Sequence, residues 1–231
     1  MTETLQPDSP RVLILIPAYN EAAHIAAVVR RAAVYLPVCV VDDGSKDETV
    51  ALAEQAGAVV LRQVPNQGKG AALRAGFRKA LEEGWDAVIT LDADGQHEPE
   101  EIPAFLDAFS QRAPDLLIGA RDFSKMPFVR RLGNTLGGWL FSWAVGQRIV
   151  DNQSGYRLLS RRLMSVVLDS SEQGFEYEVE MIVRCIQNHY HLDWVEIRTI
   201  YADEKSHIHP VQHALGFLRL VRQTRRRMNG G

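Results

Sequence analysis

The 231-residue chain has only two cysteines, and neither belongs to a CxxC pair or a Cys/His cluster. Cys39 and Cys185 lie in apolar segments, which predicts buried free thiols in a reducing compartment. A disulfide scaffold and a structural zinc site are therefore excluded. The chain also has no low-complexity tract and no internal repeat, which excludes disordered and solenoid architectures.

Long apolar runs are missing as well. The longest, Leu132 to Val145, covers 14 residues and is interrupted by Asn134 and Thr135, whereas a helix needs about 20 apolar residues to cross a bilayer. Residues 1–10 lack the basic and apolar regions of a signal peptide. We therefore expect a cytoplasmic protein with no transmembrane helix.

Acidic residues are absent from residues 205–231, which contain six Lys or Arg, so this tail carries a charge of +6 and the rest of the chain −9. The acidic body argues against nucleic-acid binding. On a helical projection the tail has an apolar arc flanked by Arg219, Arg222 and Arg226; the arc consists of Ala214, Phe217, Leu218, Val221 and Met228. This pattern predicts either a helix lying on an anionic membrane surface at the cytoplasmic face or a terminal helix that packs on the protein itself.

What the first half does contain is a regular alternation of short Val/Ile/Leu runs with amphipathic stretches, which is typical of βαβ units. The predicted strands are 12–16, 38–41, 58–61, 87–91 and 116–118, and the predicted helices are 21–35, 46–56, 69–83 and 99–111. Because the runs are continuously apolar, we expect a mostly parallel α/β sheet covered by helices on both faces. Ser45 and Glu48 predict a capping box at the second helix.

Beyond Arg121 the pattern changes to a basic loop, an apolar helix with two tryptophans, a short strand at 156–160 and further helices. No linker-like composition separates the two parts. We expect a single domain, 1–231, with a nucleotide-sugar and metal half at 11–121 and an acceptor half at 122–204. Residues 205–231 form the basic terminal segment.

Polar residues follow each predicted strand, where ligands of parallel sheets bind. Asp92 and Asp94 come after a strand at positions i and i+2, so both carboxylates can face one side and bind Mg²⁺ or Mn²⁺, with Gln96 adding a carbonyl oxygen. The alternative for this segment is an exposed turn.

Other rim residues allow two interpretations. Asp42 and Asp43 are candidates for helix caps or for binding a base and ribose, and Tyr19 and Glu21 lie beside them. Asp151 is a candidate general base or a turn cap. Lys69 is interpreted as the first residue of a helix, because the spacing around it differs from a phosphate loop.

Four ordered segments carry a family resemblance: P-A-Y-N-E at 17–21, V-D-D-G-S at 41–45, N-Q-G-K-G-A-A-L at 66–73 and D-A-D-G-Q-H at 92–97. They resemble the inverting, metal-dependent family 2 glycosyltransferases of the GT-A fold, in particular the dolichyl- or polyprenyl-phosphate mannosyl or glucosyl transferases. The second half adds the segments 119–121, 130–131, 151–157, 175–178 and 205–207 in the same order.

The resemblance implies site residues of three kinds. The nucleotide-sugar pocket would consist of Pro17, Tyr19, Glu21, Val40, Asp42 and Ala93. Asp92, Asp94 and Gln96 would hold Mg²⁺ or Mn²⁺ and the diphosphate, and Arg121, Arg131 and Lys205 would surround the donor and acceptor phosphates.

The expected reaction transfers a hexosyl group from GDP-mannose or a UDP-sugar to a polyprenyl phosphate with inversion. An alternative is transfer to a saccharide or other hydroxyl, with Asp151 taking the proton. A nucleotide-sugar-binding regulator and a nucleotidyltransferase are alternatives from other classes. The first would be expected to lack the paired acids, and the second would release pyrophosphate.

Overall fold

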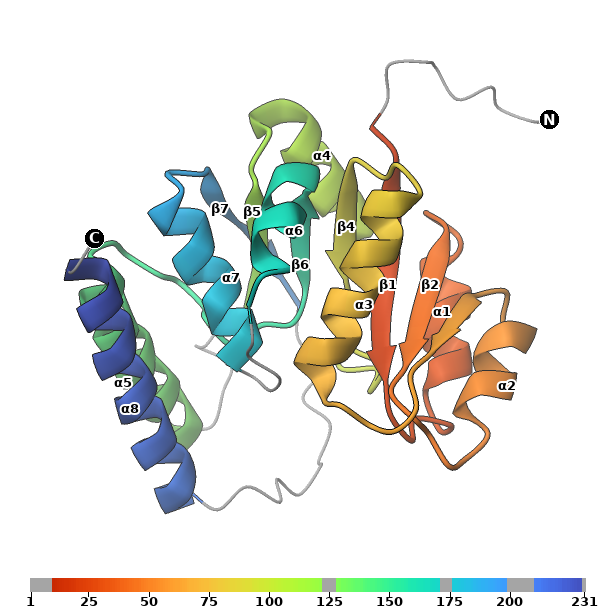
Figure 1. The fold of residues 1–231 in the computed structure, drawn as a ribbon, viewed down its shortest axis with the longest axis horizontal. Coiled ribbons are helices and arrows are strands. Elements are labelled where there is room, and N and C mark those ends of the chain that lie inside the picture. The colour runs from red at the N-terminus through yellow and green to blue at the C-terminus, as the bar shows by residue number, and fades with distance from the viewer. Residues whose placement is uncertain (1–9, 122–127, 171–175, 199–209, 230–231) are drawn as a thin grey trace.

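Seven strands of the computed structural model form one sheet in the order β3-β2-β1-β4-β6-β5-β7 (Figure 1). The structure describes residues 10–121, 128–170, 176–198 and 210–229, and within these it leaves the side chains of 128–134, 210–218 and 229 undescribed. The strands are β1 Val12–Ala18, β2 Val38–Asp42, β3 Val59–Arg62, β4 Ala87–Thr90, β5 Leu116–Arg121, β6 Arg157–Ser160 and β7 Leu192–Ile197. All neighbouring strands are parallel except β6, which is antiparallel to β4 and β5.

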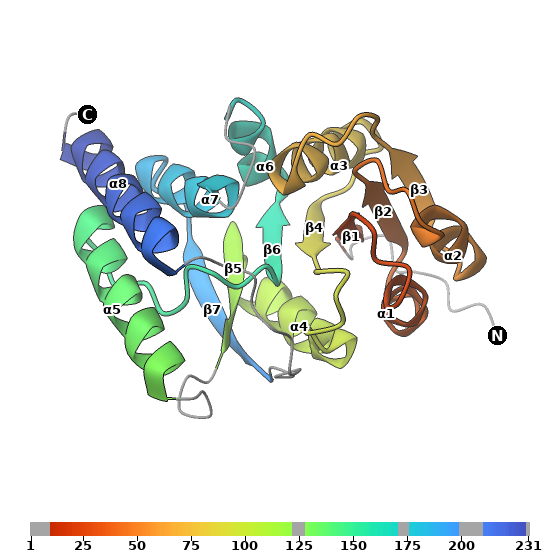
Figure 2. The same cartoon turned by 90° about the horizontal axis from the view of Figure 1, so that it is seen from below.

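Helices cover both faces of this sheet (Figure 2). They are α1 Ile25–Ala32, α2 Thr49–Gln55, α3 Lys69–Glu82, the short 3₁₀ helix η1 Pro99–Glu101, α4 Ile102–Arg112, α5 Phe128–Val145, α6 Arg161–Val167, α7 Glu176–Gln187 and α8 Pro210–Asn229. One hydrophobic core lies between the sheet and α1, α2 and α4, and the other lies between the sheet and α3, α6 and α7. This is the three-layer α/β architecture that the alternating pattern predicts.

The strand order sets the place where a ligand can bind. From β1 the chain continues outward through β2 and β3, then returns to pair β4 with the other side of β1. Such a reversal opens a crevice beyond the carboxyl ends of the two central strands. The polar segments after β1, β2 and β4 all begin at this edge.

The five strands predicted in the first half are confirmed, and so is the short strand near 156–160. One expectation about the sheet is wrong, and one strand was missed. β3 is an edge strand whose Val59 is exposed, so it is not covered on both faces. β7 was not predicted, because the alternation of Asp193 and Glu196 with apolar residues at a half-buried edge hides the run.

The predicted capping box is also wrong. Helix α2 begins after Glu48, which makes no side-chain capping bond. The Ser45 hydroxyl instead accepts a hydrogen bond of 2.9 Å from the backbone N–H of Asn20. Ser45 therefore ties the loop after β2 to the loop after β1, a contact between segments that local sequence cannot reveal.

The basic terminal segment forms α8, which packs beside α5 and α7 (Figures 1 and 2). Val221 and Thr224 are buried, and Met228 packs against the core that α7 shares. Arg227 forms an ion pair of 2.7 Å with the buried Glu180 of α7. Part of the apolar arc is thus used inside the protein, as the second sequence interpretation expects.

The apolar run 132–145 lies within α5. Neither α5 nor any other helix in the described part of the chain is both long and apolar enough to span a membrane. The apolar residues of its carboxyl half divide between the core, where Phe141 and Val145 are buried, and the surface, where Trp139 and Trp143 are exposed.

Candidate active site

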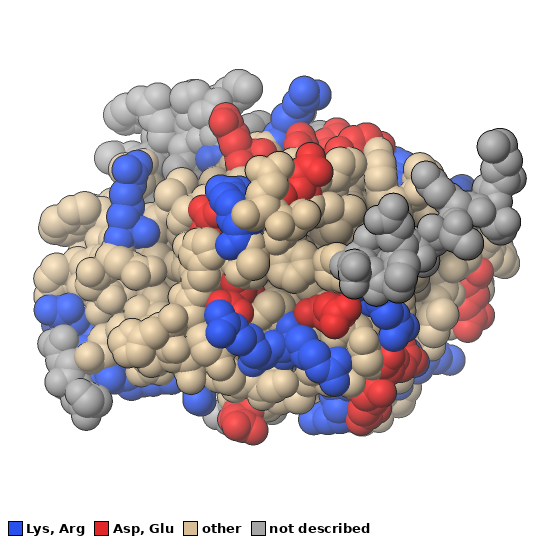
Figure 3. All heavy atoms as spheres, turned by 90° about the horizontal axis from the view of Figure 1, so that it is seen from above, with Lys and Arg blue, Asp and Glu red and all other residues tan. Residues whose placement is uncertain are grey.

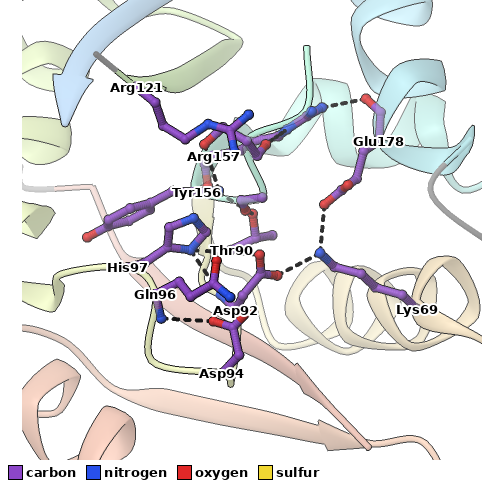
Figure 4. A network of polar contacts seen from close by, with 12 residues as sticks. Lys69, Thr90, Asp92, Asp94, Gln96, His97, Arg121, Tyr156, Arg157 and Glu178 are labelled. Carbon is purple, nitrogen blue, oxygen red and sulfur yellow. Dashed lines mark hydrogen bonds and ion pairs between the residues drawn. The ribbon is translucent and has the colours of Figure 1, made fainter. Parts of the chain in front are cut away.

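A network of charged side chains lies at the carboxyl end of β4 (Figure 4). Asp92, two residues beyond the strand, forms an ion pair of 2.6 Å between its Oδ1 and the Nζ of Lys69. The same Nζ lies 2.9 Å from the buried Glu178 of α7. One lysine at the start of α3 therefore neutralises two carboxylates from distant parts of the chain.

The protonation of this group follows from its charges. Burial alone would lower the pKa of Lys69, but the carboxylates of Asp92 and Glu178 raise it above its ordinary value. Burial alone would raise the pKa of Asp92, but the charge of Lys69, followed by that of His97, holds it at about 2. The Lys69–Asp92 pair is charged at neutral pH.

Asp94 has a different environment. It is half-buried, and its Oδ1 accepts a hydrogen bond of 2.9 Å from the backbone N–H of Gln96. Burial and the neighbouring charge of Asp92 both raise the pKa of Asp94. Within the described residues no ion pair involves Asp94, so its negative charge is the one in this loop that an added cation would stabilise most.

The turn that precedes Lys69 is fixed by Asp43. Its two carboxylate oxygens accept hydrogen bonds from the backbone N–H groups of Gln67, at 2.8 Å, and Gly68, at 2.7 Å. Gly44 permits this contact, because its backbone is left-handed and a Cβ there would lie 3.0 Å from the nitrogen of Asn66. Asp43 thus positions the start of α3, whereas sequence reasoning considered it a helix cap or a ligand-binding acid.

The loop 151–157 closes the other side of the network. Arg157 is fully buried and donates hydrogen bonds to the backbone oxygens of Ser154, Asn152 and Glu178. Burial lowers the pKa of this arginine. Because one guanidinium bridges loop 151–157 and helix α7, it fixes Glu178 relative to β6.

Gly155 lies against Asp92 so closely that only glycine fits. A Cβ at this position would lie 2.4 Å from Oδ2 of Asp92. The Thr90 hydroxyl donates a hydrogen bond of 2.7 Å to the Gly155 carbonyl and holds the loop at this distance. Loop 151–157 therefore helps to fix the orientation of the Asp92 carboxylate.

We expect Gly155→Ala to lower the free energy of unfolding by about 1–3 kcal/mol, because the added methyl group must displace the Asp92 carboxylate or the loop. Denaturant unfolding measures this change. Gly138→Ala is the matched control: it adds the same methyl group in helix α5, where the nearest atom lies 4.0 Å away. Equal stability of the two variants would contradict the assignment.

Arg121 and Asp151 form a second charged pair at the end of β5. The Nε of Arg121 lies 2.7 Å from Oδ2 of Asp151, and its Nη2 lies 3.0 Å from Oδ1. Oδ1 also accepts a hydrogen bond from the backbone N–H of Gln153. The carboxylate predicted as a general base is thus buried and occupied on both oxygens, an arrangement suited to holding Arg121 in place.

The predicted nucleotide residues surround the ends of β1 and β2. Tyr19 is exposed, Pro17 and Glu21 are partly buried, and Ala93 is buried beside the two acids. Asp42 is buried, accepts the backbone N–H of Ser45 and lies 3.7 Å from the Nε of Arg62.

Asp42 has no exposed surface, and three other predicted site residues have no described contact with this edge of the sheet. Val40 has no exposed surface and packs in the core beneath the end of β2, so its contact with a donor stays a prediction. Arg131 falls within α5, but its side chain is not described, and Lys205 lies outside the described residues.

Sequence reasoning missed the roles of Lys69, Glu178, Arg157 and His97. His97 is buried with its Nδ1 3.8 Å from Oδ2 of Asp92, and its ring packs 5.3 Å from that of Tyr156. All four residues belong to the motifs of the family resemblance, yet nothing local indicated that they converge around Asp92.

The sequence of the chain is similar to those of known proteins. Residues 13–169 match the profile of the family described as Glycosyl transferase family 2. The chain is 34% identical to the undecaprenyl-phosphate mannosyltransferase of Micrococcus luteus, across 75% of this chain and 77% of that protein. It is 28% identical to the UDP-N-acetylglucosamine–dolichyl-phosphate N-acetylglucosaminyltransferase of Methanococcus voltae, across 83% and 86%.

A solved structure has the same fold. Glucosyl-3-phosphoglycerate synthase from Mycobacterium tuberculosis, in complex with Mn²⁺, UDP and glucosyl-3-phosphoglycerate, aligns with a TM-score of 0.71 at 18% identity. The alignment covers 96% of this chain and 80% of that one. At this identity the likeness shows the fold, which is the predicted GT-A-like α/β fold.

Proposed function

Because the chain belongs to glycosyl transferase family 2, we propose that it transfers a hexosyl group from a nucleotide-diphosphate sugar to a polyprenyl phosphate. The observation that carries this proposal is the state of Asp151. Both of its oxygens are engaged by Arg121 and Gln153, so the carboxylate that a hydroxyl acceptor would require as a base is already occupied. A phosphate acceptor is ionised at neutral pH and needs no base.

Two relatives support the acceptor class, since their names specify undecaprenyl phosphate and dolichyl phosphate. The same names differ in the sugar, mannose in one and N-acetylglucosamine in the other. We therefore propose either GDP-mannose or a UDP-sugar as the donor.

The oxygen ligands of the loop after β4 fit a divalent cation. Asp92 and Asp94 supply carboxylate oxygens on one loop, and Gln96 follows on the same loop (Figure 4). Among the described residues no group of three or more His, Cys, Asp or Glu side chains could hold a metal. Mg²⁺ characteristically binds through one or two carboxylates plus substrate phosphates, so this small set suits a cation shared with a diphosphate.

In the proposed reaction the acceptor oxygen attacks the anomeric carbon from the face opposite the diphosphate. The new carbon–oxygen bond forms as the bond to the diphosphate breaks, and the nucleoside diphosphate leaves with the electron pair. A bound Mg²⁺ or Mn²⁺ would neutralise charge on the departing diphosphate. Arg121, fixed by Asp151, would attract the phosphates from the other side, together with Arg131 and Lys205.

The test measures transfer of radiolabelled sugar from a panel of nucleotide sugars to a short-chain polyprenyl phosphate in detergent. The matched control acceptor is the same polyprenol without its phosphate. We expect label in the organic phase with the phosphate and at least about tenfold less with the alcohol, because only the phosphate is already ionised. Equal use of the alcohol would refute the proposal.

A further inference from the structure

Helix α5 exposes a stripe of large apolar side chains. Leu136, Trp139 and Trp143 have exposed fractions of 55%, 66% and 53%, and their spacing of three and four places them on one face of the helix. Buried residues of the same helix, such as Phe141, face the opposite side. Two half-exposed tryptophans on one helical face mark a surface that contacts a partner.

Helix α8 lies beside this stripe and adds positive charge. Arg225 lies over the ring of Trp143, 4.9 Å from its centroid, and donates a hydrogen bond of 3.1 Å to the backbone oxygen of that residue. Arg219, Arg222 and Arg226 of α8 are exposed. The sequences of α5 and α8 together contain seven arginines and no Asp or Glu.

The two helices themselves therefore carry charge of one sign, and the nearest acids are Glu176 and Glu180 of α7, which line a hollow beside Arg226 and Arg227. In Figure 3 the end of the molecule that carries α5 and α8, at the left, shows Lys and Arg in blue and no Asp or Glu in red. The rest of the same face carries both signs. This asymmetry favours a partner with negative charge and an apolar interior.

The order of the chain relates the two helices to the candidate site. Helix α5 follows β5 and helix α8 follows β7, and these strands pair in parallel with Arg121 opposite Ile197. Both helices thus come after strands that end at the sheet edge where Arg121 and Asp151 lie. Trp139 and Trp143 belong to the carboxyl half of α5, so the stripe lies beyond the part of the helix that follows this edge.

We infer that the stripe Leu136–Trp139–Trp143 and the exposed arginines of α8 form one docking surface for an anionic lipid bilayer. Tryptophan rings prefer the boundary between headgroups and acyl chains, and arginines are attracted to anionic headgroups. The inference rests on the proposed function, because a bilayer-docking surface serves sugar transfer only when the acceptor is a lipid. It also moves the apolar contact from α8, whose Val221 is buried, to α5.

The test is cosedimentation with vesicles of phosphatidylcholine and phosphatidylglycerol at increasing salt. We expect Trp139→Ala/Trp143→Ala to weaken binding about tenfold or more, because affinity depends on the apolar area inserted. The matched control is Val34→Ala/Tyr35→Ala, which removes two exposed apolar side chains just after α1, a helix that lies far from α5 and α8 (Figure 1). This control should bind like the wild type.

A second variant separates charge from insertion. Arg219→Glu/Arg222→Glu/Arg226→Glu should abolish binding at low salt while both tryptophans remain, because the attraction to anionic headgroups is lost. If the double tryptophan variant does not unfold cooperatively, the single variant Trp139→Ala is used in the cosedimentation instead. Wild-type binding by either tryptophan variant would overturn the inference, and so would absence of binding by the wild type at low salt.

Two further outcomes are informative. A concentration-dependent dimer that the tryptophan substitutions abolish, without vesicle binding, would assign the stripe to a second copy of the chain and overturn the inference. Turnover with a short-chain acceptor in detergent is measured in parallel. Vesicle binding without any sugar transfer would refute the proposed function and leave the docking surface standing, so the two failures are distinguishable.

Discussion

Replacement of Asp94 with alanine is expected to reduce sugar transfer by about 10²- to 10³-fold while the protein stays folded. Asp94 is half-buried beside Asp92, and both burial and that neighbouring charge raise its pKa. In the proposed reaction a cation bound there would relieve this repulsion and stabilise the diphosphate in the transition state, and Asp94→Ala would remove that stabilisation. Steady-state transfer at saturating donor measures the effect.

A second readout makes the result independent of turnover. With a nucleoside diphosphate present, Mn²⁺ should raise the melting temperature of the wild type and not that of Asp94→Ala, because only binding to the native state stabilises it. Asp107→Ala is the control, since Asp107 is an exposed acid of α4 outside the site. Wild-type turnover and a wild-type Mn²⁺ shift in Asp94→Ala would refute the metal assignment.

Lys69→Met is expected to cause the largest loss of stability, about 3–5 kcal/mol in the free energy of unfolding. The substitution keeps an unbranched side chain of nearly the same length but removes the charge that Asp92 and Glu178 share. The Glu178 side chain has an exposed fraction of only 5%, so water cannot replace the lysine. Denaturant unfolding at pH 7 measures the loss.

Lys79→Met is the matched control on the same helix. Lys79 pairs with Glu83 at the surface, where such pairs contribute about 0.2–1 kcal/mol. Equal stability of the two variants would show that the Lys69 network contributes no more than a surface ion pair.

The loss caused by Lys69→Met should also depend on pH. The pKa of Asp92 in the folded protein is about 2, below its ordinary value of 3.8, so the pair stabilises the wild type above pH 3.8. This contribution is lost as the pH falls through 2. The difference in stability between the wild type and Lys69→Met should therefore narrow in acid.

Much of the fold could be predicted because its signals are local. A strand covered on both faces must be continuously apolar, and β1, β2, β4 and β5 all show this in the sequence. β7 could not be recognised, because Asp193 and Glu196 interrupt a strand whose half-buried place at the edge tolerates them. The position of β6 between β4 and β5 likewise depends on pairing between distant segments.

The sequence by itself determined the α/β class, the edge of the sheet where polar residues gather and the pair Asp92 and Asp94. Each depends on residues close together in the chain. Only the tertiary structure decided that Lys69 neutralises Asp92, that Asp151 holds Arg121 and that α8 uses Val221 inside the protein. These assignments join residues 23, 30 and more positions apart, and the energy of a charge depends on the partners and burial that folding gives it.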